Sequence, residues 1–127
     1  MRAAVAAAAV ALTVPAVVQA GTVKYRGSGG TPEVFFDVKF KHHHPRKVIN
    51  LGFNTLDCGG SYAWPDPIKV KNGSFSDSRY EPIEDGITYK IKGDFVKDNA
   101  KVKGTVQANQ VGADCNNKEK FAVRRIN

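Results

Sequence analysis

The sequence has few of the residues that build helices. After Gly21 it contains no methionine and only two leucines, against ten valines, six isoleucines and five threonines. β-Branched side chains lose rotamer freedom in a helix and pack well on the pleated surface of a sheet. No window of about eleven residues carries apolar positions at helical spacing. The composition therefore predicts an all-β protein and excludes a helical bundle.

The signatures of the common enzyme classes are also missing. The sequence has no Gly-x-Ser-x-Gly elbow, no His-Glu-x-x-His zinc motif and no Cys-x-x-Cys pair. The glycine-rich segment 27–30 precedes a strand rather than a helix, so it does not predict a phosphate-binding loop. Glu81, Glu84 and Asp85 lie too close together in one loop to form the opposed carboxylates of a glycosidase. We predict a non-enzymatic protein with no cofactor and no metal.

The long apolar run in the sequence lies at its start. Arg2 is followed by twelve residues, Ala3 to Val14, that are apolar except for one threonine, and a small-residue site ends at Ala20. This order is typical of a secretory signal peptide, and the run is short for a membrane span. We predict a cleaved signal peptide at 1–20 and one secreted domain at 21–127, extracellular or periplasmic, with no transmembrane segment.

Alternation of apolar and polar residues marks about eight short strands in this domain. In one of them Val34, Phe36, Val38 and Phe40 share a face. The expected strands cover residues 22–26, 33–41, 46–55, 68–71, 74–76, 87–96, 101–106 and 120–126. Strands at roughly ten-residue spacing favour a single antiparallel β-sandwich or a small barrel.

The connections between these strands carry turn residues. Asn72-Gly73 is the strongest hairpin signal, because both residues tolerate a positive φ. Residues 77–86 and 107–118 are polar and are expected to form loops. In the strand at 46–55 the inward residues are expected to be Ile49, Leu51 and Phe53, which follow the same period of two.

The order of these motifs resembles a group of small, uncharacterised secreted bacterial β-sandwich proteins. The resemblance covers nearly the whole of 21–127. Its most specific parts are Asn72-Gly73-Ser74-Phe75-Ser76, Gly93-Asp94-Phe95, Lys103-Gly104-Thr105-Val106 and the two cysteines. It implies a signal peptide, a sandwich-like domain and one disulfide, and it brings no catalytic residue. The segment Tyr62–Pro67 departs from the group's pattern.

The two cysteines, Cys58 and Cys115, belong to a chain that we expect to reach an oxidising compartment, so pairing is the default interpretation. Closing a loop of this length removes about 4 kcal/mol of denatured-state freedom in the chain-entropy model. The alternative is a redox-active or nucleophilic thiol, which would leave the other cysteine unpaired. We predict a structural disulfide.

Three adjacent histidines, His42, His43 and His44, form the one cluster with metal-binding chemistry. Neighbouring side chains of an extended segment point to opposite sides, so three in a row rarely converge on one ion. Lys41 and Arg46 on either side would repel a dication. We interpret the triplet as a solvated hairpin tip, with adventitious metal affinity as the alternative.

Two aromatic residues, Tyr62 and Trp64, lie in a segment bounded by glycine and proline. If the segment is extended and exposed, they would face the same way and could stack on a sugar ring, with Asp66 accepting hydroxyl hydrogen bonds. The simpler interpretation is that Trp64 covers the open end of the sandwich. The first interpretation makes the segment a candidate contact for a carbohydrate or a protein.

Charge placement gives the strongest functional signal. The chain has a net charge of +7, and the domain after residue 20 keeps +6 because Arg2 is the one charge before it. Lysines alternate with apolar residues in three strands, at Lys69, Lys71, Lys90, Lys92, Lys101 and Lys103. If these strands are neighbours, the six lysines share one outward face, whose simplest role is solubility and protection of strand edges.

The functional interpretation of these lysines is attraction to an anionic polymer of the cell envelope, with nucleic acid an unlikely partner. We expect a secreted binding or surface-associated protein. The alternative is an inhibitor or interaction protein that engages another secreted protein through a loop, with 77–86 and Tyr62–Pro67 as the candidate loops. Salt separates the two, because screening weakens polymer binding more steeply than docking of an aromatic loop.

Overall fold

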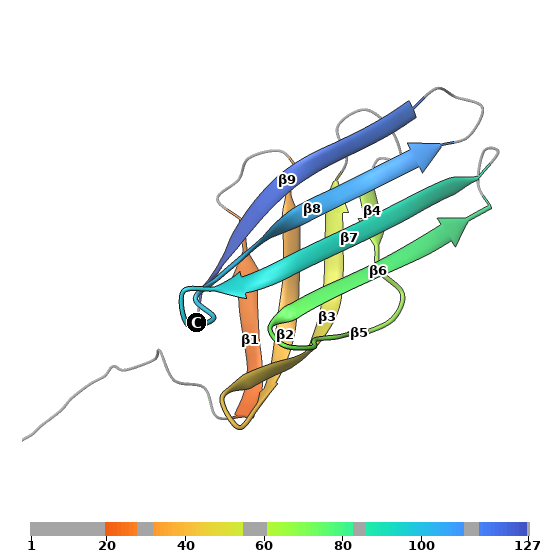
Figure 1. The fold of residues 1–127 in the computed structure, drawn as a ribbon. Helices are drawn as coiled ribbons and strands as arrows, with labels where there is room; N and C mark the ends of the chain where they lie inside the picture. The colour runs from red at the N-terminus through yellow and green to blue at the C-terminus, as the bar shows by residue number, and fades with distance from the viewer. Residues whose placement is uncertain (1–19, 28–31, 55–60, 83–85, 111–114, 127) are drawn as a thin grey trace, which may run out of the picture.

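The computed structural model describes residues 20–27, 32–54, 61–82, 86–110 and 115–126, and in this part of the chain the secondary structure is entirely β (Figure 1). The all-β, antiparallel class is therefore confirmed. The strands are β1 (Ala20–Arg26), β2 (Val34–Lys41), β3 (His44–Asn54), β4 (Ser61–Ala63), β5 (Ile68–Lys69), β6 (Ser74–Glu81), β7 (Ile87–Val96), β8 (Lys101–Gln110) and β9 (Cys115–Arg125).

These strands belong to one hydrogen-bonded sheet. Its order is β4-β3-β2-β1-β9-β8-β7-β6, and β5 pairs with β3 beside this path. β1 and β9 pair only where Tyr25 and Arg26 lie opposite Arg125 and Arg124. β1 and β9 are therefore paired only at this end, and the two strands separate beyond it. In Figure 1 the half formed by β6 to β9 crosses the half that contains β1 to β3, as in a curled half-barrel.

The hydrophobic core lies between the two halves. In β2, Val34, Phe36, Val38 and Phe40 are buried, as the period of two predicts, and Tyr25 of β1 is fully buried with them. Opposite them stand residues of the second half: Phe75, Ile87, Tyr89, Ile91, Val102, Val106, Phe121 and Val123. Edge-to-face contacts such as Phe36 with Phe75, at 5.7 Å between ring centroids, join the halves.

A β-bulge in β3 makes one sequence expectation wrong. Asn50 has a φ of 53°, and the register between β2 and β3 shifts between Phe35 and Asp37. The extra residue reverses the alternation, so Val48 is fully buried and Ile49 is only half-buried. Asn is one of the residues that tolerates this backbone conformation, because its short polar side chain bonds locally.

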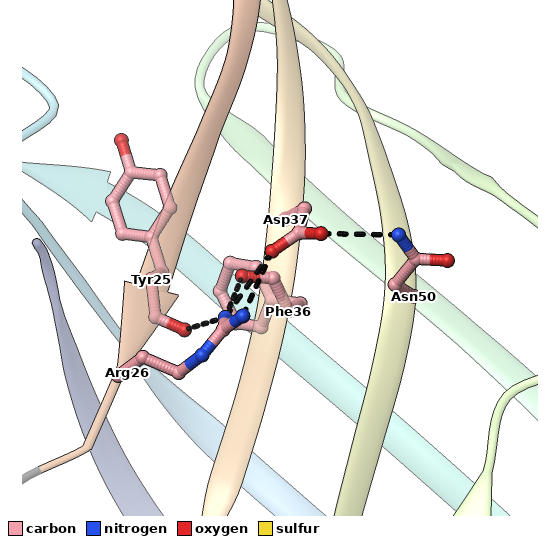
Figure 2. Close-up of polar contacts among 5 residues, drawn as sticks. All are labelled: Tyr25, Arg26, Phe36, Asp37 and Asn50. Atoms are coloured by element: carbon pink, nitrogen blue, oxygen red, sulfur yellow. Dashed lines mark hydrogen bonds and ion pairs between the residues drawn. The ribbon is translucent and has the colours of Figure 1, made fainter. Parts of the chain in front are cut away.

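The bulge is tied to the neighbouring strands by a polar cluster (Figure 2). The Asn50 amide nitrogen donates to Asp37 at 3.0 Å, and the Arg26 guanidinium forms an ion pair with the other oxygen of that carboxylate at 3.2 Å. Arg26 also donates to the backbone carbonyl oxygens of Tyr25 and Phe36 at 2.8 and 2.9 Å. On this half of the sheet a carboxylate therefore neutralises an outward cation.

The ladder between β7 and β8 contains a glycine pair that no other residue could replace without movement. Gly93 lies directly opposite Gly104. A Cβ atom added to Gly104 would stand 1.9 Å from the carbonyl oxygen of Lys92, and one added to Gly93 would stand 2.6 Å from the ring of Phe75. The close approach of two backbones and an aromatic ring requires glycine here.

The turns follow the sequence signals closely. Asn72 and Gly73 have φ values of 51° and 76°, and Lys71 and Ser74 exchange backbone hydrogen bonds across them. Residues 97–99 form the expected turn after β7, all with positive φ. The predicted signal peptide at 1–20 falls outside the described residues except for the backbone of Ala20, so both its presence and its cleavage stay predictions.

Three segments differ from expectation. The strand at 68–71 pairs with β3 through Ile68 and Lys69 and is not next to β7, because β6 occupies that position. β6 itself extends from Ser74 to Glu81, so the residues expected as a loop from Asp77 onward are largely strand. The segment expected to be loop at 107–118 is strand up to Gln110 and again from Cys115.

Candidate functional site

The candidate site is the outer face of β6–β9, the surface opposite the core. The register places its side chains in rows that cross the four strands. One row contains Ser76, Lys92, Thr105 and Lys120, and the next contains Ser78, Lys90, Gln107 and Lys118. The strands lie side by side in Figure 1. Because strands alternate their side chains, all of these residues point away from the core.

In these two rows each lysine stands opposite a neutral hydroxyl or amide and never opposite another lysine. Lys90 faces Gln107 and Ser78, and Lys118 faces Gln107 on the other side. Like charges directly opposite each other destabilise a sheet, so the arrangement spaces the cations two strands, or about 10 Å, apart. Lys90, Lys92, Lys118 and Lys120 form the corners of a grid with Thr105 and Gln107 between them.

Cations dominate the charge of this face. The charged side chains that the register places on it are Lys90, Lys92, Asp94, Lys101, Lys103, Lys118, Lys120 and Arg124. The single carboxylate, Asp94, accepts a hydrogen bond from Ser74 at 2.5 Å. Within the described residues the ion pairs are Arg26–Asp37, Arg79–Asp66 and Arg79–Asp77, so none neutralises a lysine of the grid.

A hollow of about 430 Å³ lies on the grid, and we call it the central hollow. It is lined by Ser76, Asp77, Ser78, Lys90, Ile91, Lys92, Thr105, Gln107 and Lys118. The Asp77 carboxylate is already engaged, by the Trp64 indole nitrogen at 3.0 Å and by Arg79 at 3.3 Å. The hollow thus combines three ammonium groups with hydroxyl donors, which is chemistry suited to an oxyanion.

Four of the six lysines predicted from the sequence share this face: Lys90, Lys92, Lys101 and Lys103. Lys101 is half-buried, and the other three are exposed. The prediction that all six share one face is wrong for Lys69 and Lys71. Lys69 lies on β5, opposite Lys47 of β3, because β5 joins the first half of the sheet.

Sequence reasoning missed Lys118 and placed Lys120 in a strand without assigning it a role. The signal was present, since Lys118 and Lys120 alternate with Glu119 and Phe121 at the period of a strand. Neither residue could be assigned to the lysine face before the pairing of β8 with β9 was known. That pairing sets Lys118 opposite Gln107 and Lys120 opposite Thr105.

The aromatic segment belongs to the closure of the core. Trp64 is only 6% exposed, and Tyr62 is half-buried with its ring stacked on Tyr89 at 4.0 Å between centroids. The Tyr62 hydroxyl donates to Glu81 at 2.6 Å. Together with the bond from Trp64 to Asp77, this contact spans the seam between β4 and β6, so Trp64 covers the core and does not offer an exposed face to a sugar.

Burial raises the pKa of the tyrosines in this core. Burial raises the pKa of Tyr25 to about 12, and the nearby positive charge of Arg125 partly opposes this rise. For Tyr62, burial is again the largest cause, followed by the hydrogen bond to Glu81, which favours the neutral phenol. These phenols therefore stay protonated and hold their hydrogen bonds over the neutral pH range.

The histidine triplet is fully at the surface. His42 and His43 form the two-residue turn between β2 and β3 with φ values of 53° and 67°, and His44 begins β3. All three are exposed. Among the described residues, no group of three or more His, Cys, Asp or Glu side chains is placed to hold a metal ion. The same residues include no helix with the length and hydropathy of a membrane span.

The comparisons with known proteins leave the site to be interpreted from its own geometry. No protein-family model, curated protein or solved structure matches this chain. The resemblance to small secreted bacterial proteins thus stays an expectation from the motifs.

Proposed function

We propose that this chain is a secreted, non-enzymatic binding protein that holds an anionic polymer of the cell envelope against the outer face of β6–β9. The observation that carries the proposal is the lysine grid, with Lys90, Lys92 and Lys118 around the central hollow and no ion pair to any of them among the described residues. If the lysines served only solubility, the face would not need a hollow lined with hydroxyl donors.

The expected strength of a single contact can be worked from the grid. If each ammonium group stands about 5 Å from a monovalent anion at the centre, half of the two-strand spacing, it contributes about 0.8 kcal/mol in water before screening. Four such contacts give about 3 kcal/mol, which corresponds to a dissociation constant of several millimolar. A lone anion is therefore a weak ligand, and useful affinity requires several anionic groups on one molecule.

Nucleic acid fits this face less well. Proteins that bind single strands stack bases on aromatic side chains. On the described part of the outer face of β6–β9 the aromatic residue is Tyr80, which is 63% exposed and lies opposite Thr88, away from the central hollow. The proposal is therefore for a polymer that is recognised by its charged groups.

The test is binding of the purified chain to immobilised long-chain polyphosphate at increasing salt. We expect retention at low salt that falls linearly on a log–log plot, because each neutralised phosphate releases counterions. The double substitution Lys90→Gln and Lys118→Gln should reduce the slope by about one to two and shift elution to lower salt. The matched control is Lys39→Gln with Lys41→Gln, which removes the same charge from exposed positions on β2.

Equal loss of binding in both double variants would show that net charge, and not the β6–β9 face, retains the protein. That result, or retention that ignores salt, would overturn the proposal. Unfolding curves of each variant provide the folding control, since substitutions of exposed side chains usually change stability by less than about 0.5 kcal/mol.

Export and pairing of the cysteines are part of the same proposal. We propose that residues 1–20 are removed, that Cys58 is bonded to Cys115, and that the two halves of the sheet act as the layers of a sandwich. Cys58 and the side chain of Cys115 lie outside the described residues. Intact-mass measurement of the exported protein, with alkylation before and after reduction, tests both steps. A chain that begins at Met1, or two thiols alkylated before reduction, would contradict them.

A further inference from the structure

A second hollow adjoins the central one, and we call it the rim hollow. Its volume is about 620 Å³, and its lining residues are Pro67, Ile68, Lys69, Lys71, Ser74, Phe75, Ser76, Asp77, Lys92 and Asp94. Ser76, Asp77 and Lys92 line both hollows. The two hollows therefore adjoin at β6, and Lys69 and Lys71 lie next to the basic surface through Lys92, although β5 pairs with β3.

Hydroxyl and ammonium groups lie along this path. Ser74, Ser76 and Ser78 form a row of hydroxyl groups on the outer side of β6, spanning about 13 Å along the strand. Lys69 and Lys71 lie in the hollow at one end of the row, and Lys90 and Lys118 lie in the hollow at the other end.

The carboxylates on the path already have partners. Asp94 accepts a hydrogen bond from Ser74, and Asp77 is bound by Trp64 and Arg79. Both contacts of Asp77 fall on its Oδ2 atom, on the side of β6 that faces Trp64 and the core, and Ser74 hydrogen-bonds Oδ1 of Asp94. The carboxylates therefore weaken the basic character of the path less than their number suggests.

From this arrangement we propose that the ligand is a linear polymer of tetrahedral oxyanions, phosphate or sulfate, which lies along β6 and places consecutive groups in the central and rim hollows. The proposal rests on the proposed function and extends it from a face to a path. Ammonium and hydroxyl groups around an open hollow can approach a tetrahedral anion from several directions, and lysine binds phosphate as a compact point charge without the planar fork of arginine. The described lining residues of both hollows include no arginine.

The experiment compares tripolyphosphate, which is shorter than the path, with long-chain polyphosphate and dextran sulfate. The variant Lys69→Gln with Lys71→Gln removes the cations of the rim hollow alone. We expect its affinity for both long polymers to fall by about tenfold, with a salt slope smaller by about one to two. Its affinity for tripolyphosphate should fall less, because the central hollow keeps Lys90, Lys92 and Lys118. The control is again Lys39→Gln with Lys41→Gln, which should behave like the wild type.

The outcomes separate this inference from the proposed function. If Lys90→Gln with Lys118→Gln weakens all three ligands and Lys69→Gln with Lys71→Gln weakens none, the face binds anions but the path is wrong. An equal loss of tripolyphosphate and long-polymer affinity in the rim variant would also overturn the path. Polyglutamate that binds as tightly as polyphosphate would overturn the choice of tetrahedral groups, and preference for only one of the two long polymers would identify phosphate or sulfate as the group bound.

Discussion

Replacement of Gly104 by alanine should strongly destabilise this protein. The added Cβ atom would lie 1.9 Å from the carbonyl oxygen of Lys92, whereas real Cβ atoms keep at least 3.0 Å. The obstacle is backbone, so a side-chain rotation cannot relieve it, and β7 and β8 must separate locally by about 1 Å. Separation breaks the ladder around the pair formed by Gly93 and Gly104.

The cost has two parts. Overpacking in a core costs about 1–3 kcal/mol, and two weakened ladder hydrogen bonds cost about 1 kcal/mol each. We expect a loss of about 3–5 kcal/mol for Gly104→Ala, out of the roughly 5–15 kcal/mol typical of a domain. At this size the melting temperature should fall by more than about 15 °C.

Thermal and urea unfolding followed by circular dichroism measure this loss directly. The matched control is Gly27→Ala, where the nearest atom to the new Cβ is the Val34 carbonyl oxygen at an ordinary 3.7 Å. The control should stay within about 0.5 kcal/mol of the wild type. A Gly104→Ala protein less than about 1 kcal/mol below the wild type would refute the close approach of β7 and β8.

Three further predictions concern other parts of the fold. The pKa of Tyr25 is about 12 in the folded state, against an ordinary value of 10. The stability that this difference contributes is complete below pH 10 and is lost by about 1.4 kcal/mol per pH unit as the pH rises toward 12. The urea midpoint should therefore fall above pH 10, and it should fall less in Tyr25→Phe. Replacing His42-His43 by Asn-Gly should raise stability by about 0.5–1 kcal/mol, because both residues have a positive φ, which Asn and Gly adopt more easily than His. An unchanged melting temperature would contradict this prediction. Trp64→Phe should cost about 1–3 kcal/mol by removing the donor to Asp77, and a change below that in urea unfolding would show the bond to be dispensable.

The basic surface illustrates how a sheet accommodates many like charges. Direct opposition of lysines is avoided at the grid by interleaved hydroxyl and amide groups, as in the row that contains Lys92, Thr105 and Lys120. On the first half of the sheet Arg26 is neutralised by Asp37, whereas Lys39 lies directly opposite Lys47. The hollow that lies among the lysines of the grid is the reason to propose binding at β6–β9.

Local features of the fold were predictable from the sequence because they depend on neighbours in the chain. Side chains of a strand alternate with a period of two, so the burial of Val34 and Phe36 could be predicted from their spacing alone. The turn at Asn72 and Gly73 follows from the tolerance of these residues for a positive φ. The outward direction of Lys90 and Lys92 follows from the same alternation.

The tertiary structure decided the features that depend on which strands meet. Nothing in residues 68–71 indicates that they pair with β3. Because of this pairing Lys69 is not on a strand next to β7, but it lines the rim hollow together with Lys92. The bulge at Asn50 reverses the faces of β3 in a way that alternation cannot predict. Charge in a sequence thus predicted a basic surface, but only the long-range pairing of β8 with β9 determined which lysines share it, because register is fixed by contacts between distant segments.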